Sequence, residues 1–180
     1  DISFAGPGKR PREIRAAIEV GVTLNCESET EAARALQIGE ELGIRPRLAV
    51  RVNPDFDMRG SGMKMGGGAK QFGLDAERVP ALIASLIERG ADWRGLHIYT
   101  GSQTLEADAV IETQGQVLDL AARISREIGR PCPALNLGGG FGIPYFAGNE
   151  PLDIAAVGAA LEERFADSQM VFKSGRGRQS

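Results

Sequence analysis

Side chains that can bind an anion or carry a proton follow the ends of several short apolar runs. The run RLAVRV carries Arg51, and the run GLHIY carries Tyr99 and His97, which is the only histidine of the chain. Ser102 follows three residues after Tyr99. If these runs are neighbouring parallel strands, their C-terminal ends meet at one edge, which is where α/β proteins bind ligands. We therefore expect these four side chains to border one site.

Three consecutive glycines, Gly138 to Gly140, follow another apolar run, Ala134 to Leu137. Glycine is a poor residue for stiffening a strand end, because it loses the most backbone freedom on folding. It does allow positive φ, and it lets a ligand approach backbone N–H groups with no Cβ in the way. From the triplet alone, a tight turn and a phosphate-binding loop are both open.

Each of these residues also has a purely structural interpretation. Arg51 could pair with an acidic residue on a neighbouring strand, because charged groups inside a sheet need partners. His97 could be an ordinary core or edge residue, and Tyr99 could pack with its hydroxyl at the edge. Their common position after strand ends favours a function, since structural residues have no reason to follow strand ends.

The elements that must position these residues alternate between strands and helices, which is the order of an α/β protein with a parallel sheet. The candidate strands are Ile2 to Phe4, Val22 to Cys26, Arg47 to Val52, Gly95 to Tyr99, Ala134 to Leu137 and Met170 to Phe172. AGPGKR is expected to form a turn between a strand and a helix. A capping box of Ser28 and Glu31 predicts a helix reaching Leu42, and Pro80 predicts the first turn of a helix running to Arg89. Val110, Val117, Ala121, Ile124 and Ile128 recur at helical spacing, and a last helix is expected over Leu152 to Phe165.

Two architectures fit this pattern: a doubly wound sheet and a (β/α)8 barrel. Both place ligands at the C-terminal ends of the strands. The candidate strands are too few to close an eight-stranded barrel, so a barrel would be incomplete in this chain.

Composition narrows the classes of function. At 180 residues and 42% hydrophobic content, the chain can form one sizeable core. With 21 basic and 24 acidic residues, the charge argues against nucleic acid or an anionic membrane as the partner. No apolar run approaches the ~20 residues of a membrane span and no signal peptide is evident, so a cytoplasmic location is expected. Cys26 and Cys132 show neither metal-site nor disulfide spacing, and Cys26 is expected to be buried in a strand.

The motifs HIYTGSQ (His97 to Gln103) and LNLGGGFGIPY (Leu135 to Tyr145) resemble those of the pyridoxal-phosphate-dependent decarboxylases of the alanine-racemase fold. This group holds the diaminopimelate, ornithine and arginine decarboxylases. RVNP and KQFGLD match its motifs too, and ISFAGPGKR and GSGMKMGGGAKQFG look closest to the exosortase-associated type. The resemblance implies a parallel (β/α)8 TIM-type barrel, incomplete here with about six βα units over residues 1–172. Residues 173–180 would be a polar, frayed tail.

The resemblance also implies a pyridoxal 5'-phosphate site. The family positions that bind the cofactor correspond to Arg51, His97, Tyr99, Ser102, Gly138, Gly139, Gly140 and Arg176. The glycines, Ser102 and Arg176 would hold the phosphate, and Tyr99 would stack on the pyridine ring, with His97 on the same face. Lys173 stands where the family has a glutamate that pairs with the pyridine nitrogen, and its charge would oppose a protonated ring.

The family's Schiff-base lysine belongs to a strand upstream of this sequence, and Lys9 matches a different family position. We therefore expect no catalytic residue in this chain, and no activity from the chain alone. The expected activity of the family is decarboxylation of an amino acid or a carrier-linked amino acid, with a small-molecule amino-acid substrate and a homodimer in the full-length proteins. Three alternatives are open: a racemase on the same fold, a non-catalytic binder of pyridoxal phosphate, and an incomplete barrel that self-associates.

Overall fold

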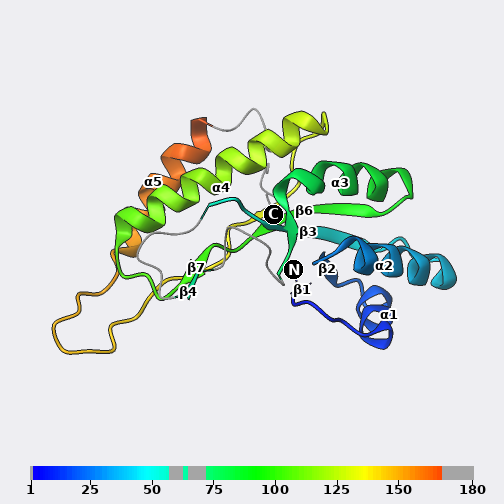
Figure 1. The fold of residues 1–180 in the computed structure, drawn as a ribbon, viewed down its shortest axis with the longest axis horizontal. Helices are drawn as coiled ribbons and strands as arrows, with labels where there is room; N and C mark the ends of the chain where they lie inside the picture. Colours follow the sequence, from blue (N-terminus) through cyan, green and yellow to red (C-terminus); the bar gives the residue numbers. More distant parts are fainter. Residues whose placement is uncertain (1, 57–62, 65–71, 168–180) are drawn as a thin grey trace, which may run out of the picture.

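The computed structural model describes residues 2–56, 63–64 and 72–167. Its centre is a parallel sheet (Figure 1). The strand order is β1 (Ser3–Phe4), β2 (Thr23–Cys26), β3 (Arg47–Asn53), β6 (Asp92–Ile98) and β8 (Leu135–Asn136), and β5 (Leu74–Asp75) also pairs with β3. A second, small sheet pairs β4 (Met63–Lys64) with β7 (Gly101–Ser102) in antiparallel fashion.

Helices follow the strands of the main sheet. They are α1 (Pro11–Glu19), α2 (Glu29–Leu42), α3 (Val79–Glu88), α4 (Ala107–Glu127) and α5 (Ile154–Asp167), and the short 3-10 helix η1 (Ala76–Arg78) leads into α3. The helices α4 and α5 pack side by side, and the segment between β8 and α5 forms a long loop (Figure 1). No helix within the described residues is long and apolar enough to cross a membrane.

The strand order decides between the two predicted architectures. Along β1, β2, β3, β6 and β8, each strand is added on the same side of the previous one, and every neighbouring pair is parallel. A doubly wound sheet reverses its order at a switch point, whereas a barrel does not. The chain is thus an incomplete (β/α) barrel, with five strand–helix units in the described residues. The sixth predicted strand, the end of the domain at residue 172 and the tail 173–180 lie outside them.

The two faces of the sheet differ in chemistry because strand side chains alternate between them. Leu24, Val50 and Ile98 face the helices and are at most 2% exposed, in one core with residues of all the first four helices. Asn25 and Arg51 alternate with these apolar residues along their strands. The predicted burial of Cys26 is confirmed, since it lies in this core.

Local signals explain where most helices begin. Ser28 precedes α2, and its hydroxyl accepts a hydrogen bond from the Glu31 backbone N–H at 3.2 Å, which is one half of the predicted capping box. The Glu31 carboxylate instead accepts from the Glu27 N–H and from Lys9. Pro80 lies in the first turn of α3, and the predicted apolar face of α4 is buried. The expected turn at AGPGKR leads into α1.

The prediction for the fourth strand of the sheet was too short. β6 begins at Asp92, three residues before the expected start at Gly95, because Asp92 and Trp93 already pair with β3. The register between β3 and β6 then shifts between Leu48 and Ala49, which leaves Arg94 as an extra residue on β6. Such a bulge depends on the partner strand and has no local sequence signal.

Candidate functional site

The C-terminal ends of β3, β6 and β8 bring four of the predicted residues together. Arg51 lies directly opposite His97 in the pairing of β3 with β6, and His97 lies opposite Asn136 in the pairing of β6 with β8. Tyr99 directly follows β6, and its ring centroid is 6.0 Å from the Arg51 guanidinium carbon. Gly138 follows β8 and packs against Tyr99. The structure therefore gathers these residues at one edge of the sheet, as the sequence predicts.

The glycine turn, Gly138 to Gly140, is shaped by its contact with Tyr99. A Cβ at Gly138 would lie 2.8 Å from Cδ2 of Tyr99, and the φ of Gly138 is +73°. Both features require glycine. The backbone N–H of Gly138 donates to Oδ1 of Asn136 at 2.9 Å.

The rest of the glycine turn is open. A Cβ at Gly139 would meet nothing within 4 Å. Gly140 has a φ of +99°, and its carbonyl accepts a hydrogen bond from the Thr104 N–H at 3.0 Å. Among the residues that the structure describes, the N–H groups of Gly139 and Gly140 have no acceptor. Two adjacent, unpartnered N–H groups at a strand end are suited to bind an anion such as a phosphate.

Arg51 is 8% exposed and forms an ion pair inside the protein. Its Nη1 donates to Oε1 of Glu27 at 3.0 Å, and Glu27 directly follows the neighbouring strand β2. The guanidinium also lies over the ring of Phe72, 4.9 Å from its centroid. The structural interpretation of Arg51, an ion pair with an acidic residue beside it, is thus confirmed.

His97 is half-buried, and its Nδ1 has no hydrogen-bond partner within the described part of the chain. Burial lowers the pKa of His97 below its ordinary value, and the positive charge of Arg51 lowers it further, whereas the negative charge of Glu27 acts in the opposite direction. The imidazole is therefore neutral near pH 7.

Lys9 is buried beside this site, where hydrogen bonds hold its ammonium group. Its ammonium donates to the carbonyl oxygens of Gly6 at 2.7 Å and Asn25 at 2.9 Å, and to Oε1 of Glu31 at 2.8 Å. An ammonium group carries three protons, so all its donors are engaged. This geometry agrees with the expectation that Lys9 does not hold a cofactor covalently.

Two predicted site residues are less completely placed. Ser102 lies in β7, opposite Met63. Arg176 lies outside the described residues, as does Lys173. The prediction of their roles therefore stays a prediction.

Three residues of the site were missed by the sequence analysis: Glu27, Phe72 and Asn136. The rule applied to Arg51 and His97, a polar residue at the end of an apolar run, also finds Glu27 in TLNCE and Asn136 in LNLGGG. Phe72 carries no such signal, because its contact with Arg51 depends on how the chain returns to β3.

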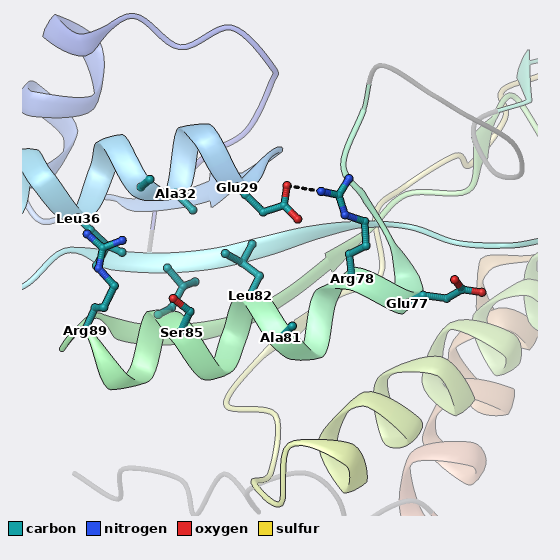
Figure 2. A pocket seen from close by; sticks show the side chains of 11 residues that line it. Glu29, Ala32, Leu36, Glu77, Arg78, Ala81, Leu82, Ser85 and Arg89 are labelled. Carbon is teal, nitrogen blue, oxygen red and sulfur yellow. Dashed lines mark hydrogen bonds and ion pairs between the residues drawn. The ribbon is translucent and has the colours of Figure 1, made fainter.

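A groove of about 570 Å³ lies apart from this site, between α2 and α3 (Figure 2). Ala32, Leu36 and Leu82 contribute apolar side chains to it, and an ion pair of Glu29 with Arg78 at 2.6 Å lies at one end. None of the predicted cofactor-binding residues lines this groove.

Comparison with known sequences identifies the class of protein. The family described as "Pyridoxal-dependent decarboxylase, pyridoxal binding domain" matches residues 1–177. The chain therefore belongs to the pyridoxal-dependent decarboxylase family and corresponds to its pyridoxal binding domain, which confirms the resemblance. The cofactor of this family is pyridoxal phosphate.

Individual relatives and a solved structure are similar to this chain over most of its length. The L-glutamyl-[BtrI acyl-carrier protein] decarboxylase of Niallia circulans is 34% identical over 98% of this chain and 44% of its own length. The diaminopimelate decarboxylase of Pseudomonas fluorescens is 35% identical over 97% of this chain and 43% of its own length. The crystal structure of the diaminopimelate decarboxylase of M. jannaschii in complex with L-lysine matches with a TM-score of 0.84 and 27% identity, over 95% of this chain and 40% of that chain. The chain thus spans less than half the length of these relatives.

Proposed function

We propose that this chain provides the phosphate-binding part of the pyridoxal-phosphate site of an amino-acid decarboxylase. The observation that carries the proposal is the glycine turn at the end of β8. Gly138 holds the turn against Tyr99, while the adjacent N–H groups of Gly139 and Gly140 have no acceptor within the described residues. The residues present therefore fit a phosphate group.

The surrounding residues take roles that follow from their positions. Gly139 and Gly140 bind the phosphate through N–H groups, and Ser102 and Arg176 complete its binding by analogy with the family. The Tyr99 ring lies beside the glycine turn. Its proposed role, which follows the resemblance to the family, is to stack on the pyridine ring of the cofactor. When bound, the cofactor supplies the electron sink that accepts the charge left by a departing carboxylate. The residues of this chain hold and orient it.

His97 and Arg51 form the polar border of the site. The lowered pKa of His97 leaves a neutral ring, and its Nδ1 is buried without a hydrogen-bond partner in the described part of the chain. Arg51 contributes positive charge that Glu27 partly offsets. We propose no catalytic residue within this chain, and the three hydrogen bonds of Lys9 support a structural role for it.

The substrate proposed is an amino acid, either free or linked to a carrier protein. The names of two relatives support this class: one is a diaminopimelate decarboxylase, and the other acts on an L-glutamyl group of an acyl-carrier protein. Carbon dioxide release from diaminopimelate, ornithine and a carrier-linked glutamyl group, measured with the full-length protein, tests it. Racemisation without carbon dioxide release would contradict decarboxylation.

A pair of glycine variants tests the cofactor site directly. Gly139→Val fills the open space over the turn, and we expect it to weaken binding of pyridoxal phosphate by about tenfold or more. Gly158→Val is the control, because a Cβ at Gly158 also meets nothing within 4 Å but lies on α5. Titration of the cofactor absorbance gives both dissociation constants. Equal binding by the two variants would contradict the proposed phosphate site.

We further propose that the complete protein is a homodimer. The support is the loop after the glycine turn, where Ile143, Tyr145 and Phe146 are 58, 66 and 77% exposed. Exposed apolar residues gathered in one loop are typical of a contact surface. Sedimentation of the full-length protein, with and without Ile143→Ser and Phe146→Ser, measures this. A monomer at all concentrations would contradict it.

A cytoplasmic location is also part of the proposal. Cys26 and Cys132 are both free and buried. Burial raises the pKa of Cys26 to about 12 and that of Cys132 to about 11, so both thiols stay protonated near neutral pH. Free thiols of this kind are usual in a reducing compartment. Cell fractionation of the source organism checks the location.

A further inference from the structure

Glu27 is the point at which three separate segments meet. The residue directly follows β2, and its side chain is 2% exposed. Oε1 accepts hydrogen bonds from the Gly6 N–H at 2.7 Å and from Nη1 of Arg51 at 3.0 Å. Oε2 accepts from Nη1 of Arg51 at 3.3 Å and from the Gly73 N–H at 3.0 Å. Both oxygens of one buried carboxylate are thus fully used.

The two backbone donors are glycines for a geometric reason. Gly6 and Gly73 have φ values of +103° and +75°, which lie in the left-handed region. A Cβ at Gly73 would also come within 2.9 Å of the carbonyl oxygen of Arg51. Only glycine therefore brings this N–H so close to the carboxylate beside β3.

The position of the Arg51 guanidinium follows from this carboxylate. The group lies over the rings of Phe72 and Tyr99, at 4.9 and 6.0 Å, and on the strand position opposite His97. The attraction of the guanidinium to these two aromatic rings does not by itself fix its position, because a cation–π contact has no defined donor and acceptor atoms. A charge-assisted hydrogen bond to a fixed acceptor has a defined direction. Glu27 is the group that supplies it.

We propose that Glu27 is a positioning residue of the strand-end site. Its carboxylate fixes the Arg51 guanidinium beside Tyr99 and His97, and it ties the turn at Gly6 and the chain at Gly73 to the same point. Removal of Glu27 releases Arg51 and both turns together. The proposal concerns contacts within the chain and does not depend on which substrate the protein uses.

Amide hydrogen exchange of the purified chain, labelled with ¹⁵N, tests the proposal. In Glu27→Gln, one carboxylate oxygen becomes an NH₂ group, which cannot accept a hydrogen bond. At least one of the Gly6 and Gly73 amides must therefore lose its acceptor and exchange about tenfold faster or more. Glu29→Gln is the matched control, because Glu29 is partly exposed and pairs with Arg78 instead. Wild-type exchange at both glycines in a folded Glu27→Gln variant would overturn the proposal.

The single histidine of the chain provides a second readout that a purely structural role would not move. Glu27 raises the pKa of His97 against burial and Arg51. We expect the NMR titration of His97 to shift to lower pH in Glu27→Gln, and to return toward the wild-type value in Glu27→Asp, which keeps the charge. An unchanged titration in a folded Glu27→Gln variant would count against the proposal.

Two further measurements cover the case in which the Glu27 variants do not fold and separate this proposal from the proposed function. If both Glu27 variants fail to fold, the wild-type chain is measured: Gly6 and Gly73 must both be protected about tenfold or more, and unprotected amides overturn the proposal. Pyridoxal phosphate binding by the Gly139→Val variant tests the proposed function separately. Failure of that test leaves the exchange result for Glu27 intact.

Discussion

The residues at the C-terminal ends of the strands fall into two groups, which differ in whether their polar groups already have partners within the chain. In the half formed by β1, β2 and β3, which we term the closed half, Lys9, Glu27, Glu31 and Arg51 bind one another and nearby backbone groups. In the half formed by β6 and β8, the open half, the N–H groups of Gly139 and Gly140 have no acceptor within the described residues.

This difference separates framework from binding surface. Buried charges must be paired to be tolerated, so the closed half is complete in itself. Exposed glycine N–H groups without a protein acceptor cost little stability in the absence of a ligand, because water can hydrogen-bond to them. Substitutions in the closed half should therefore act on stability, and most of those in the open half on ligand binding.

The largest effect is expected for Lys9→Met in the closed half. Methionine fills a similar volume but leaves the buried carboxylate of Glu31 without its counter-charge. Loss of one partner of a buried pair costs about 3–5 kcal/mol. Urea unfolding measures the change. The double variant Lys9→Met/Glu31→Leu removes both charges and should recover part of the loss, and a loss as large as in the single variant would show that the charges are not coupled.

Gly138→Ala is the exception expected in the open half, because Gly138 is held against Tyr99. The new Cβ meets Cδ2 of Tyr99 at 2.8 Å and the carbonyl oxygen of Ile98 at 2.9 Å, at a positive φ. We expect a loss of about 2 kcal/mol in unfolding free energy. Gly158→Ala, on the open face of α5, should cause no loss. Equal stability of the two variants would mean that the glycine turn does not rest on Tyr99.

The stability of the chain is expected to depend on pH through His97, which lies between the two halves. Its pKa in the folded chain lies below the ordinary 6.5 of the unfolded chain, so the unfolded state binds more protons in the interval between them. Stability contributed by the neutral imidazole is therefore full above about 6.5 and is lost as the pH falls through that interval. Denaturant unfolding at a series of pH values shows this, and His97→Gln should lack this component. An identical pH profile for the variant would contradict it.

The smallest effect is expected for Arg78→Ala, which breaks an ion pair outside both halves. Arg78 and Glu29 are 61% and 46% exposed, in contrast to the buried pairs of the closed half. Exposed pairs contribute about 0–1 kcal/mol, and we expect a change of about 0.5 kcal/mol or less. The same urea experiment measures it. A loss comparable to that of Lys9→Met would remove the distinction between buried and exposed pairs.

The sequence predicts those parts of the fold that local chemistry determines. Ser28 and Glu31 locate the start of α2 because a hydroxyl must satisfy the free N–H groups of the first turn. The position of Arg51, His97 and Gly138 at one edge follows from parallel strands alone. These inferences need only neighbouring residues or the general geometry of a sheet.

Features that depend on distant segments could not be predicted in the same way. Lys9 lies in a glycine-rich turn, which normally indicates an exposed side chain, yet it is 4% exposed because Glu31 and two carbonyl groups surround its ammonium. Glu27 acquires its role only where Gly6, Arg51 and Gly73 converge. The choice between the two architectures likewise needed the observed order of the strands.

The contacts of Glu27 also set an order of assembly during synthesis. Lys9 and Glu31 are 22 residues apart, and Glu27 and Arg51 are 24 apart, so both pairs can form early. Gly73 lies 46 residues beyond Glu27, and its N–H can reach the carboxylate only after the ribosome has delivered the intervening chain. Until then, Oε2 of Glu27 lacks one of its partners. The first three strands therefore complete their contacts with Glu27 only after the 20 residues from the end of β3 to Gly73 have been made.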